Sequence, residues 1–284
     1  MTWTLHQNGG EYLTCPLLDG AGVPHLFSTR WGGVSAGCFS DWNFASGTED
    51  VKDDPEHVLE NYERAARIFG LRKEDVCRTY QAHTDRVLTV GEPERGVGIS
   101  KPKFPFGVDG LVTASPDLLL SVRTADCVPI LLADPYAGVC AAVHAGWRGT
   151  AAGIAAVAVG EMGRSGADPA RILAALGPCA GPDCYEVGED VRQAFALSFP
   201  GSDPFFRPKD PEAGSGDPKY LLDMAGANRA RLIRAGLTED HISVCGLCTH
   251  CRTDLFFSHR AMGIRRGTMS AFICVPSGGK GVLT

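Results

Sequence analysis

The sequence predicts an α/β or α+β fold in which helices lie outside a sandwich of buried strands. Apolar residues make up 44% of the 284 residues, the usual supply for a packed core. Near-continuous apolar runs, such as residues 129–133 and 139–144, predict strands buried on both faces. Segments with helical spacing of apolar residues lie between these runs. Because no repeat or long low-complexity segment interrupts the chain, we expect one domain over residues 1–284.

In chain order, a strand is predicted at residues 23–29, followed by a turn-rich segment at 30–49. Residues 54–69 are predicted as a helix, with Asp53 or Asp54 as its cap and Pro55 at its first position. Further strands are predicted at 86–90, 110–114, 118–122, 129–133, 139–144, 172–176, 242–246 and 269–274, and further helices at 149–162, 189–198 and 221–235. Residues 200–219, rich in Pro, Gly, Asp and Ser, are expected to form an exposed loop.

Charge and cysteine content narrow the class of protein. The net charge is -6 and no basic run is present, so we expect no nucleic-acid partner. No stretch approaches the roughly 18 apolar residues of a spanning helix, so no membrane partner is expected. The first residues lack the pattern of an export signal, which predicts a cytoplasmic protein whose eleven cysteines are reduced thiols.

Three polar residues occur where predicted strands begin or end: His83, Cys127 and His144. Two imidazoles and one thiolate form a typical catalytic zinc set, with a fourth position open to water or substrate. The spacing is far longer than the compact pairs of structural zinc modules. Spacing alone therefore does not separate a metal site from a solvated histidine or an inert buried cysteine.

The residues after His144 favour a functional site. The segment HAGWRGT leads from a buried strand into an Ala-rich helix. Its glycines let the backbone approach a ligand, the free N–H groups at a helix start favour an anion, and Arg148 can contact phosphate or carboxylate. The sequence thus predicts a metal ligand beside an anion pocket. The alternative is an ordinary strand-to-helix turn in which Trp147 packs.

Seven segments together resemble the YfiH family, whose members are described as polyphenol oxidases or laccases, as peptidoglycan editing factors, and as purine nucleoside phosphorylases with adenosine deaminase activity. These segments are STRWGGVS (28–35), QAHTDRV (81–87), VDGLVT (108–113), TADCVPILL (124–132), AAVHAGWRGT (141–150), GPCAGPDCYEVGEDV (177–191) and CTHCRTDLFFSHR (248–260). The resemblance implies a two-sheet mixed sandwich flanked by helices. It also implies one zinc ion, bound and used in catalysis by His83, Cys127 and His144.

The resemblance further implies polar positions near the pocket at Arg30, Asn43 and Arg148. The implied activities are phosphorolysis of adenosine, inosine, guanosine or methylthioadenosine to base and ribose 1-phosphate, and deamination of adenosine to inosine. Purine nucleoside and phosphate are then the expected partners. In deamination, zinc would lower the pKa of a bound water to roughly 7 for attack at C6. In phosphorolysis, Arg148 or Arg30 would neutralise the phosphate.

Other functions use the same residues. A laccase-type copper cluster needs many histidines, usually as H-x-H pairs, whereas the chain has eight histidines and no such pair. A full multicopper set is therefore disfavoured. Polyphenol oxidation stays an alternative, with copper bound adventitiously in the zinc site. A metal-free hydrolase would use Cys127 as nucleophile and His83 or His144 as base. An amidase that edits peptidoglycan precursors and a non-enzymatic binding protein are the remaining alternatives. The oligomeric state is not indicated.

Two further motifs are set aside. Residues 33–37 match G-x-S-x-G, but no helical pattern follows, so we expect a turn rather than a nucleophile elbow. Cys245, Cys248 and Cys251 form C-x2-C-x2-C without the fourth cysteine and proline of an iron–sulfur run. We expect these thiols at a strand end and turn, and Cys179 and Cys184 as structural residues.

Overall fold

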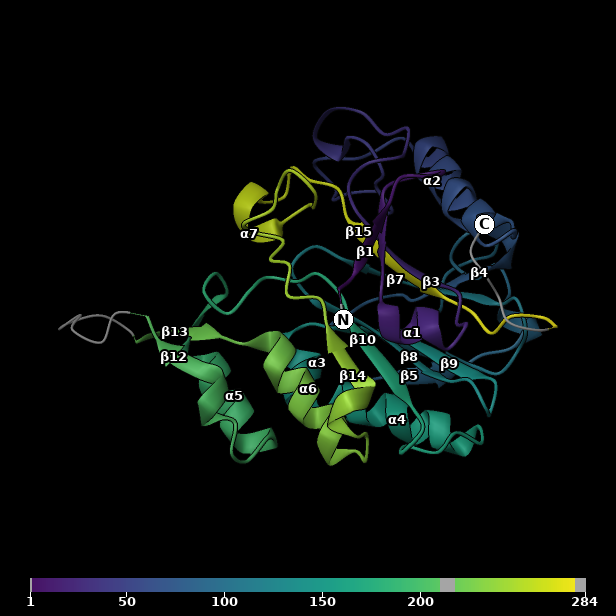
Figure 1. Cartoon of the computed structure of the whole chain (residues 1–284). Coiled ribbons are helices and arrows are strands. Elements are labelled where there is room, and N and C mark those ends of the chain that lie inside the picture. The colour runs from purple at the N-terminus through teal and green to yellow at the C-terminus, as the bar shows by residue number, and fades with distance from the viewer. Residues whose placement is uncertain (1, 210–217, 279–284) are drawn as a thin grey trace.

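The chain folds into a sandwich of two mixed sheets with helices on both outer faces (Figure 1). The computed structural model describes residues 2–209 and 218–278. The first sheet has the order β1 (Thr4–His6), β2 (Tyr12–Thr14), β3 (His25–Ser28), β15 (Met269–Ile273), β7 (Leu119–Thr124), β4 (Val76–Arg78). The second has the order β14 (Ile242–Val244), β10 (Leu173–Leu176), β8 (Val128–Asp134), β9 (Val139–Ala145), β6 (Gly110–Thr113), β5 (Val87–Thr89).

A small third sheet has the order β11 (Glu186–Gly188), β13 (Lys219–Leu222), β12 (Phe206–Pro208). The helices are α1 (Pro16–Gly20), α2 (Pro55–Ile68), α3 (Trp147–Ala152), α4 (Ile154–Arg164), α5 (Glu189–Ser198), α6 (Met224–Arg234) and α7 (His259–Met262). Single 3-10 turns occur at Gly37–Phe39, Lys73–Asp75, Glu92–Glu94, Asp203–Phe205 and Glu239–His241. The pairs β4–β7, β5–β6 and β10–β14 are parallel, and the other pairs of neighbouring strands in the two large sheets are antiparallel, so both sheets are mixed. The expected two-sheet sandwich is confirmed.

The central strands alternate between two apolar cores. In β8, Ile130 and Leu132 face the core shared with the helices, whereas Leu131 faces the core between the sheets. In β9, Val143 faces the core shared with the helices, and Ala142 faces the core between the sheets. Because both faces are covered, the side-chain period of two produces a continuous apolar run, as predicted.

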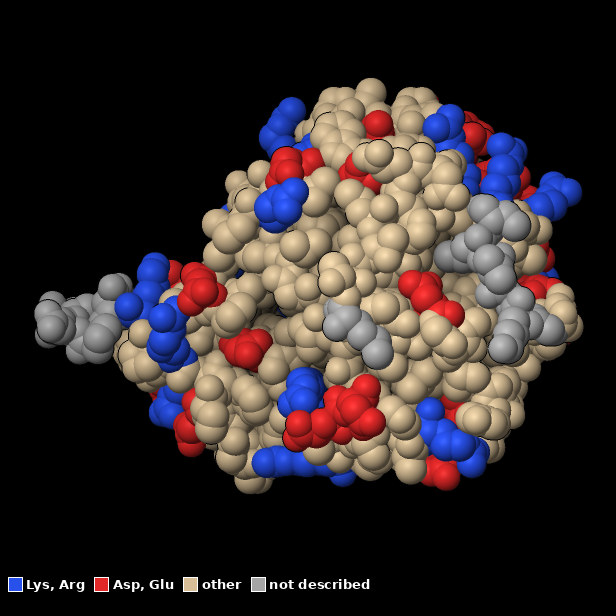
Figure 2. All heavy atoms as spheres, in the orientation of Figure 1, with Lys and Arg blue, Asp and Glu red and all other residues tan. Residues whose placement is uncertain are grey.

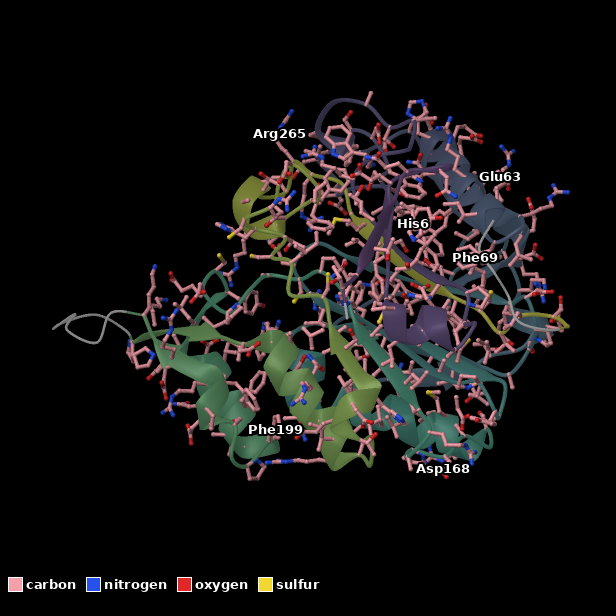
Figure 3. The ribbon with its side chains drawn as sticks, viewed as in Figure 1. His6, Glu63, Phe69, Asp168, Phe199 and Arg265 are labelled. Atoms are coloured by element: carbon pink, nitrogen blue, oxygen red, sulfur yellow. The ribbon has the colours of Figure 1, made fainter. Side chains whose placement is uncertain are left out.

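A third core lies between α2 and the outer face of the first sheet. In Figure 3, Phe69 at the end of α2 and His6 on β1 lie on the side of the first sheet. Phe199 and Asp168 lie on the opposite side of the molecule, among the helices that cover the second sheet. The predicted start of α2 is confirmed. Asp54 Oδ1 accepts a hydrogen bond from the Glu56 amide at 2.9 Å, and Pro55 is the first helical residue.

Three predicted boundaries were wrong. The helix expected at 149–162 is split into α3 and α4 by Gly153, which adopts a left-handed φ of 92°. The helix expected at 221–235 begins only at Met224, because residues 219–222 pair with β11 and β12. The loop expected at 200–219 contains β12, and its residues 210–217 lie outside the described residues.

The surface carries mixed charge. On the face shown in Figure 2, Lys and Arg side chains are interspersed with Asp and Glu. In residues 2–209 and 218–278, no helix is long and apolar enough to cross a membrane.

Candidate metal centre

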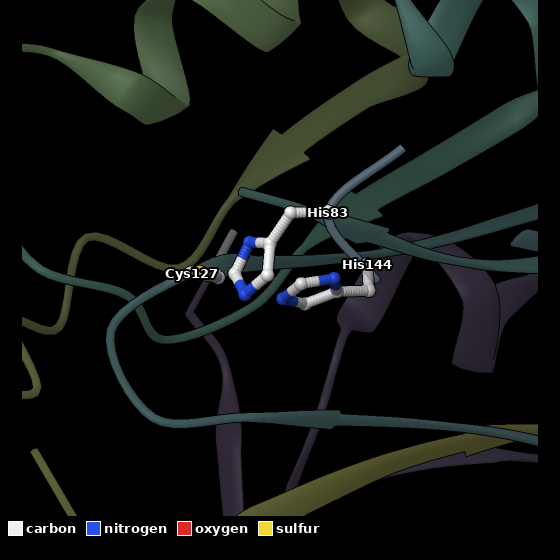
Figure 4. Close-up of side chains that lie close together, drawn as sticks. All are labelled: His83, Cys127 and His144. Atoms are coloured by element: carbon white, nitrogen blue, oxygen red, sulfur yellow. The ribbon is translucent and has the colours of Figure 1, made fainter. Parts of the chain in front are cut away.

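The three predicted ligands converge on one point. His83 lies in the loop between β4 and β5, Cys127 immediately precedes β8, and His144 lies near the end of β9. Antiparallel pairing of β8 with β9 aligns Pro129 with His144, which brings the start of β8 beside the end of β9. The ligand atoms of the three residues all lie within 4.8 Å of one another, and Figure 4 shows the two imidazoles and the thiol turned toward a common space.

Asp109 orients both histidines. It is fully buried and immediately precedes β6. Its Oδ1 accepts hydrogen bonds from His144 Nδ1 at 2.8 Å and from the His83 amide at 3.1 Å. A carboxylate at Nδ1 fixes the proton there and leaves Nε2 of His144 free as a metal ligand. The sequence reasoning did not single out this residue, although it lies in the quoted VDGLVT segment.

The loop that carries His83 is held in an unusual backbone conformation. His83 has a φ of 58°, in the left-handed region that costs a non-glycine residue of order 1–3 kcal/mol. Asp109 Oδ2 offsets this cost by accepting hydrogen bonds from the Ala82 amide at 3.1 Å and from the Thr84 amide and hydroxyl at 2.8 and 2.9 Å. The loop position therefore depends on one buried carboxylate.

A second carboxylate supports Cys127 from the preceding position. Asp126 has a left-handed φ of 92°. Its Oδ1 accepts a hydrogen bond from the Thr249 hydroxyl at 2.6 Å, and its Oδ2 accepts one from the Arg260 amide at 2.7 Å. These bonds anchor the turn from which the Cys127 thiol projects.

The charges of the site favour a cation. Burial alone would lower the pKa of His144, but electrostatic interactions and hydrogen bonds with Cys127 and Asp109 outweigh burial and raise that pKa to about 9. Burial opposes ionisation of Asp109 as well, yet hydrogen bonds from His144 and Thr84 hold its pKa at about 2. Burial and the positive charge of His144 lower the pKa of His83. A metal ion would displace the proton from His144 and take its place between these groups.

Gly146 is required by close approach rather than by its backbone angle. A Cβ atom at this position would lie 2.5 Å from His83 Nδ1 and 3.3 Å from Cys127 Sγ. The backbone after β9 thus forms one wall of the site, as the glycine-rich turn predicted.

The donor set fits zinc. Two imidazole nitrogens and one thiolate form a recognised zinc set, and the carboxylate behind His144 is the usual second partner of a zinc-bound histidine. His83 is exposed, Cys127 half-buried and His144 buried, so the site is open to the surface on the side of His83.

Two clefts meet at the metal ligands. A narrower cleft of about 260 Å³ is lined by Gln81, Arg123 and Thr268 together with the three ligands. A wider cleft of about 580 Å³ is lined by two of the ligands and by aromatic and cationic residues, namely Trp147, Arg148, Tyr185 and Arg260. Arg266 and His259 line both clefts.

Only one of the three predicted pocket residues lies in these clefts. Arg148 lines the wider cleft with its guanidinium over the Trp147 ring, 4.2 Å from the centroid. Arg30 instead donates hydrogen bonds to the carbonyls of Ser40 and Thr253, at 3.1 and 2.8 Å. Its guanidinium therefore joins two loops, and Arg30 is not among the residues that line the two clefts.

Asn43 is also placed by internal bonds. It is fully buried, its Nδ2 donates to Ala45 O at 2.6 Å, and its Oδ1 accepts from the Thr268 amide at 2.9 Å. Because Ala45 and Thr268 line the narrower cleft, Asn43 shapes that cleft from behind instead of facing it.

Sequence reasoning missed the cationic residue shared by both clefts. Nε of Arg266 and Nε of Arg123 are buried and have no hydrogen-bond partner among the described residues. Burial and the nearby Arg78 lower the pKa of Arg123 to about 10, so it remains charged at neutral pH. No motif in the sequence pointed to either arginine, because each reaches the site only through the fold.

Comparisons with known proteins place the chain among its relatives. A family model described as multi-copper polyphenol oxidoreductase laccase matches residues 24–276. A purine nucleoside phosphorylase of Deinococcus radiodurans is 41% identical over 89% of this chain and 90% of its own length. The adenosine deaminase RL5, from an unknown prokaryotic organism, is 40% identical over 76% and 81%. The crystal structure of YfiH from Bacillus licheniformis superposes with a TM-score of 0.85 at 32% identity, covering 95% of this chain and 98% of that one.

Proposed function

The chain belongs to the YfiH family of laccase-like proteins, and on that premise we propose that it is a zinc-dependent purine nucleoside enzyme. The proposed reactions are phosphorolysis of adenosine, inosine, guanosine or methylthioadenosine, and deamination of adenosine to inosine. The observation that carries the proposal is the meeting of a two-histidine, one-thiolate site with two arginine-lined clefts. The names of relatives at 40–41% identity support the same substrates.

The proposed metal is one zinc ion held by His83, Cys127 and His144. When bound, zinc would supply a Lewis acid with one open coordination position. Asp109 would hold His144 in the tautomer that presents Nε2 to the metal. Gly146, which has no side chain, would leave space for His83 and Cys127 to reach the ion. Copper in the same three-ligand site is the disfavoured alternative.

The wider cleft has side chains suited to both proposed substrates, the purine nucleoside and phosphate. Trp147, which is half-buried, offers an aromatic surface for a purine ring, and the buried Tyr185 lines the same cleft. Arg148 and Arg260 lie over these rings, at 4.2 and 4.7 Å from the centroids, so cationic groups for phosphate lie beside the base-binding surface. Arg266 extends the positive charge to the metal ligands.

In phosphorolysis, a phosphate oxygen forms a bond to ribose C1′ as the bond from C1′ to N9 of the base breaks. The role proposed for Arg148 and Arg266 is to hold the phosphate beside C1′ and to neutralise its charge. In deamination, water adds at C6 and ammonia leaves, so no phosphate is required. The two reactions therefore differ in their need for the arginines.

The proposed location of this activity is the cytoplasm, because the Cys127 ligand must stay reduced to bind a metal.

The decisive experiment incubates metal-quantified protein with adenosine, with and without phosphate, and resolves inosine, adenine and ribose 1-phosphate. We expect inosine in both conditions, and adenine with ribose 1-phosphate only when phosphate is present. The Cys127→Ser variant, purified identically, controls for contaminating enzymes. Absence of any product from zinc-loaded protein would overturn the proposal.

The laccase description of the family defines the main rival function. A polyphenol oxidase would consume oxygen with a phenol when loaded with copper. Oxygen consumption by the copper-loaded protein, without nucleoside turnover by the zinc-loaded protein, would replace our proposal with oxidation.

A further inference from the structure

A second group of metal-ligand type lies outside the site described above. The thiols of Cys184, Cys248 and Cys251 all lie within 4.8 Å of one another, and the Sγ atoms of Cys184 and Cys251 are 3.4 Å apart. Cys184 comes from the turn before β11, and the other two come from the turn that follows β14. We call these three residues the thiol cluster.

The cluster resembles a structural zinc site in its local geometry. Cys248 and Cys251 have the C-x2-C spacing of ligand pairs in such sites. The Gly181 amide donates a hydrogen bond to Cys248 Sγ at 3.1 Å, a contact that stabilises a thiolate. A Cβ atom at Gly181 would lie 3.3 Å from this sulfur, so the glycine allows the two turns to approach.

The sequence pattern grouped the wrong cysteines. Cys245, the first of the C-x2-C-x2-C run, packs against the core between the sheets, and its amide donates to Leu176 O at 2.9 Å. Cys184 takes its place in the cluster. The backbones of the two turns pair at an isolated β-bridge between residues 179 and 248, and both of these cysteines are free thiols. No local spacing in the sequence could reveal this pairing.

We propose that Cys184, Cys248 and Cys251 form a second zinc site, with three thiolate ligands and a fourth position open to water. Two sulfur atoms bound tetrahedrally to one zinc ion lie roughly 3.8 Å apart, given Zn–S bonds of about 2.3 Å. The cluster is therefore close to the required size without rearrangement. Thiolates are soft ligands and select zinc over magnesium or calcium, and the cluster lacks the fourth cysteine of an iron–sulfur centre.

The second site is placed to brace the first. Thr249 lies between two of the cluster cysteines, and its hydroxyl donates to Asp126 Oδ1 at 2.6 Å. The Ala180 amide, in the other turn of the cluster, donates to Asp126 O at 2.9 Å. Asp126 is the neighbour of Cys127. A zinc ion that clamps the two turns would thereby hold the segment that carries a ligand of the first site.

The test is zinc stoichiometry. Reduced, chelator-stripped protein is loaded with zinc, freed of excess by gel filtration, and measured by elemental analysis. We expect two ions per chain in the wild type, one in Cys251→Ser and one in Cys127→Ser. Cys251 is exposed, so its replacement should leave the fold intact. Cys245→Ser, from the same run but outside the cluster, is the matched control and should retain two ions.

Cobalt provides a second readout that isolates the cluster. In the Cys127→Ser background, thiolate-to-cobalt charge-transfer absorption should persist, and adding Cys251→Ser should abolish it. One zinc ion per wild-type chain, lost in Cys127→Ser and unaffected by Cys251→Ser, would overturn the proposal. A Cys184–Cys251 disulfide in protein purified under reducing conditions would overturn it in favour of a redox pair.

Discussion

Replacing Asp109 by Asn tests how the metal site is built. The carboxylate accepts five hydrogen bonds: from His144 Nδ1, from the amides of residues 82–84 and from the Thr84 hydroxyl. Asn keeps the shape but offers one acceptor oxygen instead of two, so two or three donors lose their partner. At about 1–3 kcal/mol for each donor left unpaired, and with relaxation of the loop, we expect the free energy of unfolding to fall by about 2–4 kcal/mol.

The effect on the metal should be separable from the effect on the fold. Loss of the carboxylate behind a zinc-bound histidine weakens affinity by about 10–100-fold, or about 1.4–2.7 kcal/mol. Competition with a chromogenic chelator measures this affinity, and urea unfolding measures stability. Asp85→Asn, in the same loop but exposed, is the control and should change neither quantity. Unchanged zinc affinity in folded Asp109→Asn would refute the assigned role of Asp109.

Three further changes have defined outcomes. Gly146→Ala should weaken zinc binding at least tenfold, because the added methyl group would lie 2.5 Å from Nδ1 of His83. Gly160→Ala is the control and should leave zinc binding unchanged, because its methyl group would meet no atom within 4 Å. Arg148→Ala should raise the KM for phosphate at least tenfold while changing the KM for nucleoside little, with Arg229→Ala as control because that arginine pairs with Glu239 away from the clefts. The free energy of unfolding should fall as the pH drops below about 6.5, by at most about 1.4 kcal/mol per pH unit, because burial lowers the pKa of His25.

The sign of the pH effect follows from the hydrogen bonds of His25. Its Nδ1 donates to Val23 O and its Nε2 accepts from the Cys15 amide, so the folded protein requires the neutral ring. The unfolded chain therefore takes up the proton first. The stabilisation is full above the unfolded pKa and is lost as the pH falls toward the folded pKa. His25→Gln should flatten this dependence in urea titrations between pH 5 and 7.5.

Each of these three expectations has a contrary result. Tight zinc binding by Gly146→Ala would mean that His83 and Cys127 do not need the space beside Gly146 to bind the ion. An unchanged phosphate requirement in Arg148→Ala would remove that residue from phosphate binding. A pH profile that His25→Gln leaves unaltered would assign the acid sensitivity to other groups.

The fold was largely predictable because burial left a clear pattern. Strands β8 and β9 read as continuous apolar runs since both their faces meet a core. The helix at 189–198 was predicted with its observed bounds. By contrast, the helix breaks where Gly153 takes a left-handed φ, which the apolar pattern does not mark. Residues 219–222 pair with β11 and β12, and this tertiary pairing overrides the local helical pattern.

The site was predictable only in its chemistry. Strand-end placement and residue type indicated His83, Cys127 and His144, and the structure brings them together. The support from Asp109 and the partnership of Cys184 with Cys248 and Cys251 arise from contacts between distant segments. No spacing rule links those residues, so sequence reasoning treated Cys184 as a structural residue.

The central claim is that a zinc ion on His83, Cys127 and His144 is required for activity. The most direct measurement determines zinc content and adenosine turnover on the same samples during chelation and zinc repletion, in wild type and in Cys251→Ser. In the Cys251→Ser variant the thiol cluster should bind no zinc, so the measured zinc content reports the first site alone. Our account predicts that turnover of Cys251→Ser falls to zero as its single remaining ion is removed, and that turnover returns with zinc. Turnover that survives complete zinc removal would contradict it and favour Cys127 as a nucleophile.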